Sequence, residues 1–74
     1  MAKGIPVGRN SNLVRITAEA KRILIQTKDW EKTRDHTYMW IKANFGLSRT
    51  TVTDYIDDVY ARLTKDPETR GFLQ

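Results

Sequence analysis

The chain has 74 residues and a mass of 8.6 kDa, which allows one small domain. It contains no cysteine and one histidine, so disulfides and cysteine or histidine metal clusters are excluded. The hydrophobic fraction of 39% and the charged fraction of 30% are typical of a globular domain. No apolar run approaches the roughly 20 residues of a membrane span, and the N-terminus lacks the apolar segment of a secretory signal. We therefore expect a cytoplasmic protein with no cofactor, no small-molecule substrate and no enzymatic activity.

The charge is unevenly distributed. The chain carries 13 basic and nine acidic residues, and residues 1–34 hold eight of the basic but three of the acidic ones, a net charge of +5. Residues 35–74 have a net charge of −1. The basic half favours a polyanionic partner, of which nucleic acid is the commonest.

The first twelve residues, with two glycines, a proline and few apolar side chains, predict an extended and flexible basic arm. Residues 13–16 alternate briefly, which is consistent with a short strand or with extended chain. Thr17 is a candidate N-cap, and the apolar spacing that follows predicts a helix over 18–29.

A second helix is predicted over 36–45, with Thr33 or Asp35 as its cap and Gly46 as its left-handed end. Ser48 is a good N-cap for a third helix over 49–64. This helix has the strongest apolar periodicity in the chain, formed by Val52, Tyr55, Ile56, Val59, Tyr60 and Leu63. The Asp66-Pro67 pair should end it, leaving residues 66–74 as a tail.

Residues 38–57, YMWIKANFGLSRTTVTDYID, resemble the helix-turn-helix of DNA-binding proteins. That family has a glycine at the ninth of about twenty positions, in the turn, and apolar residues at four others. Counted from Tyr38, the matching residues are Ile41, Gly46, Leu47, Val52 and Tyr55. One departure is Lys42, which stands where the family usually has alanine.

The resemblance implies that the third helix projects its first turns into the major groove. Arg49, Thr50, Thr53 and Asp54 then occupy the positions that reach base edges. The arm is similar to those of homeodomains and of invertases and resolvases, which lay an arginine in the minor groove; Arg9 is the candidate here. Basic and hydroxyl side chains also suit phosphate contacts. With the base-edge and minor-groove candidates included, the predicted DNA-binding residues are Arg9, Arg15, Lys21, Arg22, Ser48, Arg49, Thr50, Thr51, Thr53 and Asp54.

The third helix also carries three carboxylates, Asp54, Asp57 and Asp58, which repel phosphates. Asp54 could accept a hydrogen bond from the amino group of a cytosine, and Asp58 could form an ion pair with Arg62, which lies four residues further along the helix. The alternative hypothesis is therefore a helical protein-interaction module that uses this acidic face, with Met39 and Trp40 as a dimer surface if they are exposed. A small RNA-binding or ribosome-associated protein is a third possibility.

These observations predict an all-α protein, a small three-helix bundle with a helix-turn-helix and an extended N-terminal arm. The arm is expected over 1–12, the helix-turn-helix domain over 13–65 and the tail over 66–74. The function that we expect is double-stranded DNA binding by a transcriptional regulator, cytoplasmic and nucleoid-associated, which could form a homodimer to match a two-fold operator.

Overall fold

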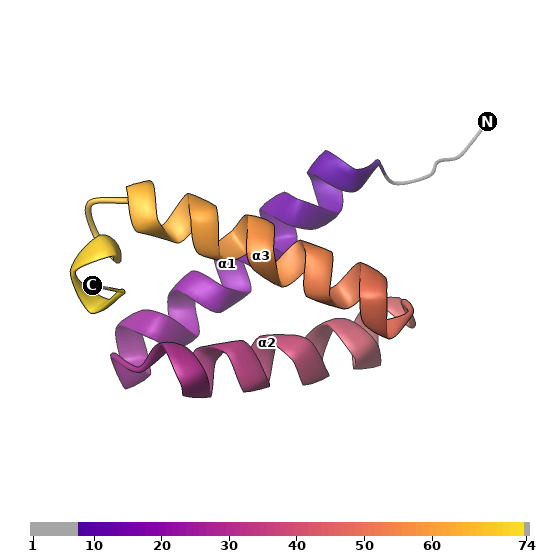
Figure 1. The fold of residues 1–74 in the computed structure, drawn as a ribbon, viewed down its shortest axis with the longest axis horizontal. Coiled ribbons are helices and arrows are strands. Elements are labelled where there is room, and N and C mark those ends of the chain that lie inside the picture. The colour runs from indigo at the N-terminus through magenta and orange to yellow at the C-terminus, as the bar shows by residue number, and fades with distance from the viewer. Residues whose placement is uncertain (1–7, 74) are drawn as a thin grey trace.

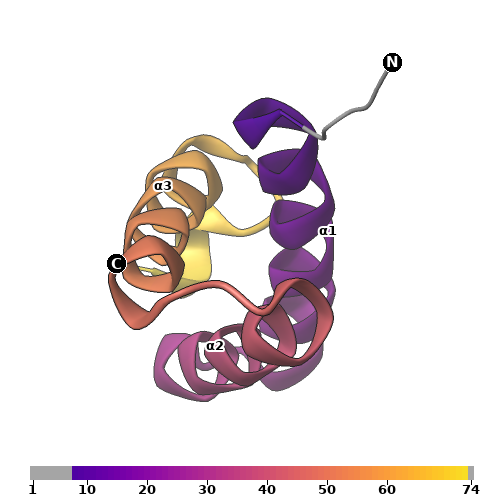
Figure 2. The same cartoon turned by 90° about the vertical axis from the view of Figure 1, so that its right-hand side faces the viewer.

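The computed structural model describes residues 8–73 as three helices that each contact the other two (Figure 1). The helices are α1 (Arg9–Thr27), α2 (Trp30–Phe45) and α3 (Arg49–Lys65), followed by a 3-10 turn, η1 (Arg70–Phe72). Seen from the end, the three helices surround a common centre (Figure 2). The predicted all-α three-helix bundle is confirmed.

The core lies where the three helices meet. Residues from α1 and α3 supply most of it, and α2 contributes one large apolar side chain, Ile41. Trp30, Tyr38, Trp40, Phe45, Leu47, Phe72 and Leu73 are partly buried and pack against this centre. The buried cluster consists of Leu13, Ile16, Ala20, Leu24, Ile41, Val52, Tyr55, Ile56, Val59 and Leu63.

The predicted start of the first helix is wrong. α1 begins at Arg9, so residues 9–12 are helical rather than part of an extended arm, and residues 13–16 form neither a strand nor extended chain. Thr17 lies inside the helix, and the N-cap is Gly8, which makes no side-chain capping bond. The first turn is instead held by contacts to α3, which local sequence signals do not reveal. The remaining arm residues, 1–7, lie outside the described part of the chain.

The predicted start of the second helix is also wrong. α2 begins at Trp30 because Asp29 caps it, accepting a hydrogen bond from the Lys32 N–H at 3.3 Å. Its buried face continues toward the N-terminus through Thr33 and Thr37, which are both fully buried. Because two residues of this buried face are threonines, which count as polar in a sequence pattern, the buried stripe of α2 is hard to recognise from the sequence.

The end of α3 and the tail agree with the prediction to within a residue. α3 ends at Lys65, before Asp66 and Pro67. The tail then folds back on the bundle, since Thr69 is buried and its hydroxyl donates to the Leu63 carbonyl at 2.7 Å. Phe72 and Leu73 close that end of the core.

The two buried threonines of α2 generate a stability prediction. The hydroxyl of Thr37 has no hydrogen-bond partner among residues 8–73, whereas that of Thr33 donates to the Asp29 carbonyl at 2.8 Å. Thr37→Val should raise the free energy of unfolding by about 1 kcal/mol, because it replaces an unpaired buried hydroxyl with a methyl of the same shape. Thr33→Val, the matched control, should lower it by about 1 kcal/mol. Urea unfolding, monitored by tryptophan fluorescence, measures the free energy of unfolding of both variants. A Thr37→Val variant less stable than the unsubstituted protein would contradict the conclusion that the Thr37 hydroxyl is unpaired.

Candidate nucleic-acid interface

The connection between α2 and α3 has the local geometry that the sequence predicts. Gly46 adopts φ 63°, and its N–H donates to the Lys42 carbonyl at 3.2 Å, which ends α2. Ser48 caps α3, accepting from the Thr51 N–H at 3.4 Å. Glycine adopts positive φ without steric cost, so α2 stops and α3 starts within three residues. This connection faces the viewer in Figure 2.

The apolar frame around this turn is packed into the core. Ile41 and Val52 are fully buried, and Tyr55 is nearly so. Leu47 is half-buried against the same cluster. Lys42, which departs from the family pattern, is exposed to solvent, so its charge does not have to be buried between the helices.

The first two turns of α3 expose most of their predicted contact residues. Arg49, Thr50, Thr53 and Asp54 are all exposed. Their hydroxyls are not equally available, because that of Thr53 donates to the Arg49 carbonyl at 2.9 Å. Ser48 and Thr51 hydrogen-bond to each other at 3.1 Å as part of the cap. Thr50 is the exposed threonine of this segment whose hydroxyl has no hydrogen bond within residues 8–73.

Three of the predicted DNA-binding residues already have acidic partners. Lys21 lies 2.8 Å from both Asp66 and Glu68, which tie α1 to the tail. Arg22 pairs with Glu19 at 2.8 Å on α1. Arg9 pairs with Asp58 on α3; Asp58 therefore contacts Arg9, whereas no ion pair joins it to Arg62 within the described residues. These pairs reduce the positive charge that the N-terminal half offers to a polyanion.

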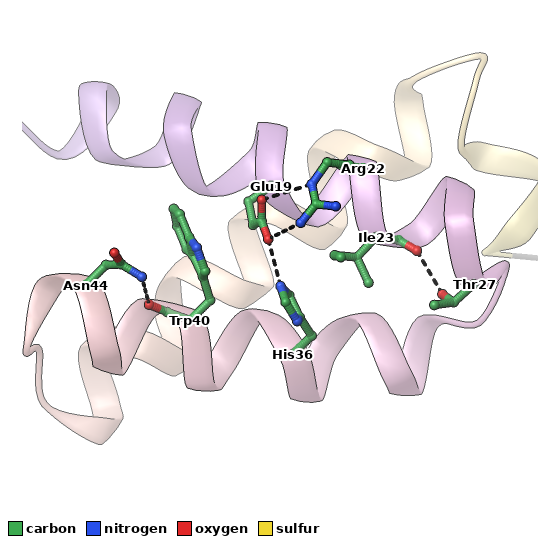
Figure 3. A network of polar contacts seen from close by, with 7 residues as sticks. All are labelled: Glu19, Arg22, Ile23, Thr27, His36, Trp40 and Asn44. Carbon is green, nitrogen blue, oxygen red and sulfur yellow. Dashed lines mark hydrogen bonds and ion pairs between the residues drawn. The ribbon is translucent and has the colours of Figure 1, made fainter.

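Glu19 is the centre of a polar network between α1 and α2 (Figure 3). Its carboxylate accepts from Nε and Nη2 of Arg22 and lies 2.7 Å from Nε2 of His36 on α2. The hydrogen bonds from Arg22 lower the pKa of Glu19 most, and the one with His36 adds to the effect, against an opposing contribution from burial. His36 therefore joins α2 to α1 through Glu19, and Arg22 binds the same carboxylate from within α1.

A different group of basic residues surrounds the α2–α3 turn. Lys42 and Arg49 flank the turn from α2 and α3, and the Arg15 guanidinium of α1 lies 5.2 Å from the centre of the Phe45 ring at the end of α2. We call these three residues the turn cluster. None of them has an ion-pair partner between residues 8 and 73, and no acidic residue occurs from position 36 to position 53.

Within residues 8–73, the turn cluster differs from the other basic residues that have no ion pair. Those other residues are Lys28, Lys32, Arg62, Lys65 and Arg70. Each of them has an acidic residue within two positions along the sequence, except Arg62, whose nearest acidic residue is four positions away. Lys42 was not predicted as a contact residue. The acid-free run of sequence on both sides of Gly46 is the signal that could have found it.

The acidic residues of α3 also separate into two groups. Asp54 and Asp57 are exposed and have no ion-pair partner among residues 8–73, whereas Asp58 is paired. Met39 is 67% exposed on α2, but Trp40 packs against the core and its ring lies 5.9 Å from that of Phe45. Trp40 is therefore not a free surface residue.

Some kinds of site are not found in the described part of the chain. Residues 8–73 contain no pocket and no group of three or more side chains suited to hold a metal ion. None of their helices has both the length and the apolar character needed to cross a membrane. No protein-family model, curated protein or solved structure matches the chain.

The Glu19 network predicts a dependence of stability on pH. The pKa of Glu19 lies below its ordinary value of 4.5 in the folded protein, so its contribution to stability is fully present above that value and is lost as pH falls through the folded pKa. Glu19→Gln should lower the free energy of unfolding by about 1 kcal/mol at pH 7. The variant should also lose less stability than the unsubstituted protein between about pH 5 and pH 3. Thermal unfolding across this range measures the effect. Equal acid sensitivity in Glu31→Gln and Glu19→Gln would contradict it, because Glu31 is exposed and has no ion pair in the described chain.

Proposed function

We propose that the protein binds double-stranded DNA with the end of the bundle that carries the α2–α3 turn. The observation that carries this proposal is the turn cluster, in which Arg15, Lys42 and Arg49 gather positive charge where no acidic side chain is paired with it. DNA affinity rests largely on such phosphate contacts, which release condensed counterions. The resemblance of residues 38–57 to a helix-turn-helix supports the same end of the molecule.

In this binding mode α3 enters the major groove by its first turn. Arg49 and Thr50 are exposed there and can reach base edges, and arginine can contact guanine through two hydrogen bonds. Arg15 and Lys42 lie on the neighbouring helices and contact the phosphates on either side. The function that follows is transcriptional regulation by a nucleoid-associated protein. Dimerisation would let it recognise a two-fold operator.

The test is fluorescence anisotropy of a labelled duplex titrated with the protein at several salt concentrations. Arg49→Gln should weaken binding about tenfold, and Lys42→Gln should lower the slope of log affinity against log salt by about 0.9, as expected for one lost phosphate contact.

Arg70→Gln is the matched control. It removes the same charge from η1, which lies at the end of the bundle opposite the α2–α3 turn (Figure 1), and its affinity should stay within about twofold of the unsubstituted protein. Equal losses for Arg49→Gln and Arg70→Gln would mean that only net charge matters and would contradict the proposed site. A preference for structured RNA in direct competition would replace DNA as the partner.

We propose as the second candidate a protein-interaction module that uses the exposed face of α3. The observation in its favour is that Asp54 and Asp57 are exposed without ion-pair partners in the described chain, as expected if a basic partner, such as another copy, pairs with them.

Sedimentation of the free protein tests this candidate. A dimer that dissociates in Asp54→Lys/Asp57→Lys, with no DNA binding at about 50 mM salt, would support it. Glu31→Lys/Asp35→Lys makes the same charge change on α2 and should leave the assembly intact. An assembly unaffected by the α3 substitutions would exclude the candidate.

A further inference from the structure

The first residue of α1 is held against the middle of α3. The Arg9 guanidinium pairs with the Asp58 carboxylate and lies 4.4 Å from the centre of the Tyr55 ring. One turn further along α1, the Asn12 side-chain amide donates to the Tyr55 hydroxyl at 3.3 Å. These contacts fix the position of Arg9, although its side chain and that of Asp58 remain about half exposed.

This arrangement changes the charge that α3 presents. The helix carries three acidic and three basic residues, and its acidic residues all lie in one turn, at positions 54, 57 and 58. The hydrogen bond and the charge of Asp58 raise the pKa of Arg9, and the guanidinium lies directly against this carboxylate. Without Arg9, Asp58 would be a third carboxylate, beside Asp54 and Asp57, with no ion-pair partner in the described chain, directly after the residues that we place in the groove.

We propose that Arg9 is an internal counter-ion that limits the repulsion between Asp58 on α3 and the phosphate backbone, and that it does not itself contact DNA. The inference rests on the proposed DNA-binding function. It differs from the sequence-based expectation, in which Arg9 belongs to an arm that enters the minor groove. A guanidinium that is helical, ion-paired and stacked on Tyr55 would have to give up these contacts to reach a groove.

The two roles differ in how Asp58 affects them. If Arg9 neutralises Asp58, its loss weakens binding because a carboxylate is uncovered, and removal of that carboxylate restores binding. If Arg9 contacts a phosphate directly, removal of Asp58 does not replace the lost contact. The salt dependence differs as well, since only a lost phosphate contact lowers the slope, by about 0.9.

The experiment compares Arg9→Gln, Arg9→Gln/Asp58→Asn and Arg9→Gln/Asp35→Asn in the anisotropy titration. Both double variants have the net charge of the unsubstituted protein, and Asp35 is also an exposed residue that pairs with an arginine, Arg34 at 3.6 Å on α2. Arg9→Gln should bind about fivefold more weakly, as one uncovered surface charge near phosphates implies, with an unchanged salt slope. Asp58→Asn should restore the affinity to within about twofold, whereas Asp35→Asn should leave it as weak as in Arg9→Gln.

Each outcome has a distinct meaning. If the unsubstituted protein does not bind DNA, the proposed function fails and this inference fails with it. If it binds but Asp58→Asn does not restore affinity, or if Arg9→Gln binds normally, the inference alone is overturned. Should Arg9→Gln lower the melting temperature, the swapped pair Arg9→Asp/Asp58→Arg gives the second test. Because the swap retains the ion pair and the net charge, its affinity should stay within about twofold, and a loss as large as that of Arg9→Gln would also overturn the inference.

Discussion

The apolar stripe of α3 is the constraint on which the other parts of the structure depend. Val52, Val59 and Leu63 are almost completely buried, and both other helices pack against this helix. The start of α1 is held through Tyr55 and Asp58, and the tail is held through the Leu63 carbonyl. A chain of 74 residues has little apolar surface to bury, so the connections that it needs are concentrated on its most regular helix.

The parts of the fold that depend on local signals were predictable. α3, its Ser48 cap and the left-handed Gly46 were all expected, since capping residues and a regular stripe act within a few positions. The start of α1 was missed because contacts to α3 stabilise it. The start of α2 was missed because Thr33 and Thr37 bury polar side chains where the pattern requires apolar ones. For α1 the deciding contacts join residues far apart in the chain. For α2 the Asp29 cap is a local signal, but the buried threonines hide the apolar pattern that continues from it.

The candidate site was predictable only in part, for a related reason. Summed charge identified a basic N-terminal half, but the fold pairs Lys21 with Asp66 and Arg9 with Asp58, residues more than forty positions away. Such ion pairs cannot be predicted from the composition or from the charge summed over a segment. The turn cluster combines Arg15 from α1 with Lys42 and Arg49, so it exists only after α1 has packed beside the α2–α3 turn.

The distribution of charge along α3 is consistent with a helix that contacts its partner by its first turn and not along its length. Arg49 lies at the exposed start, and the carboxylates follow from position 54 onward. Phosphates attract the first group and repel the second, so binding along the whole helix would be unfavourable. In the proposed mode, Arg9 limits this repulsion at Asp58, and Asp54 and Asp57 remain as the residues that set how deeply α3 can enter the groove.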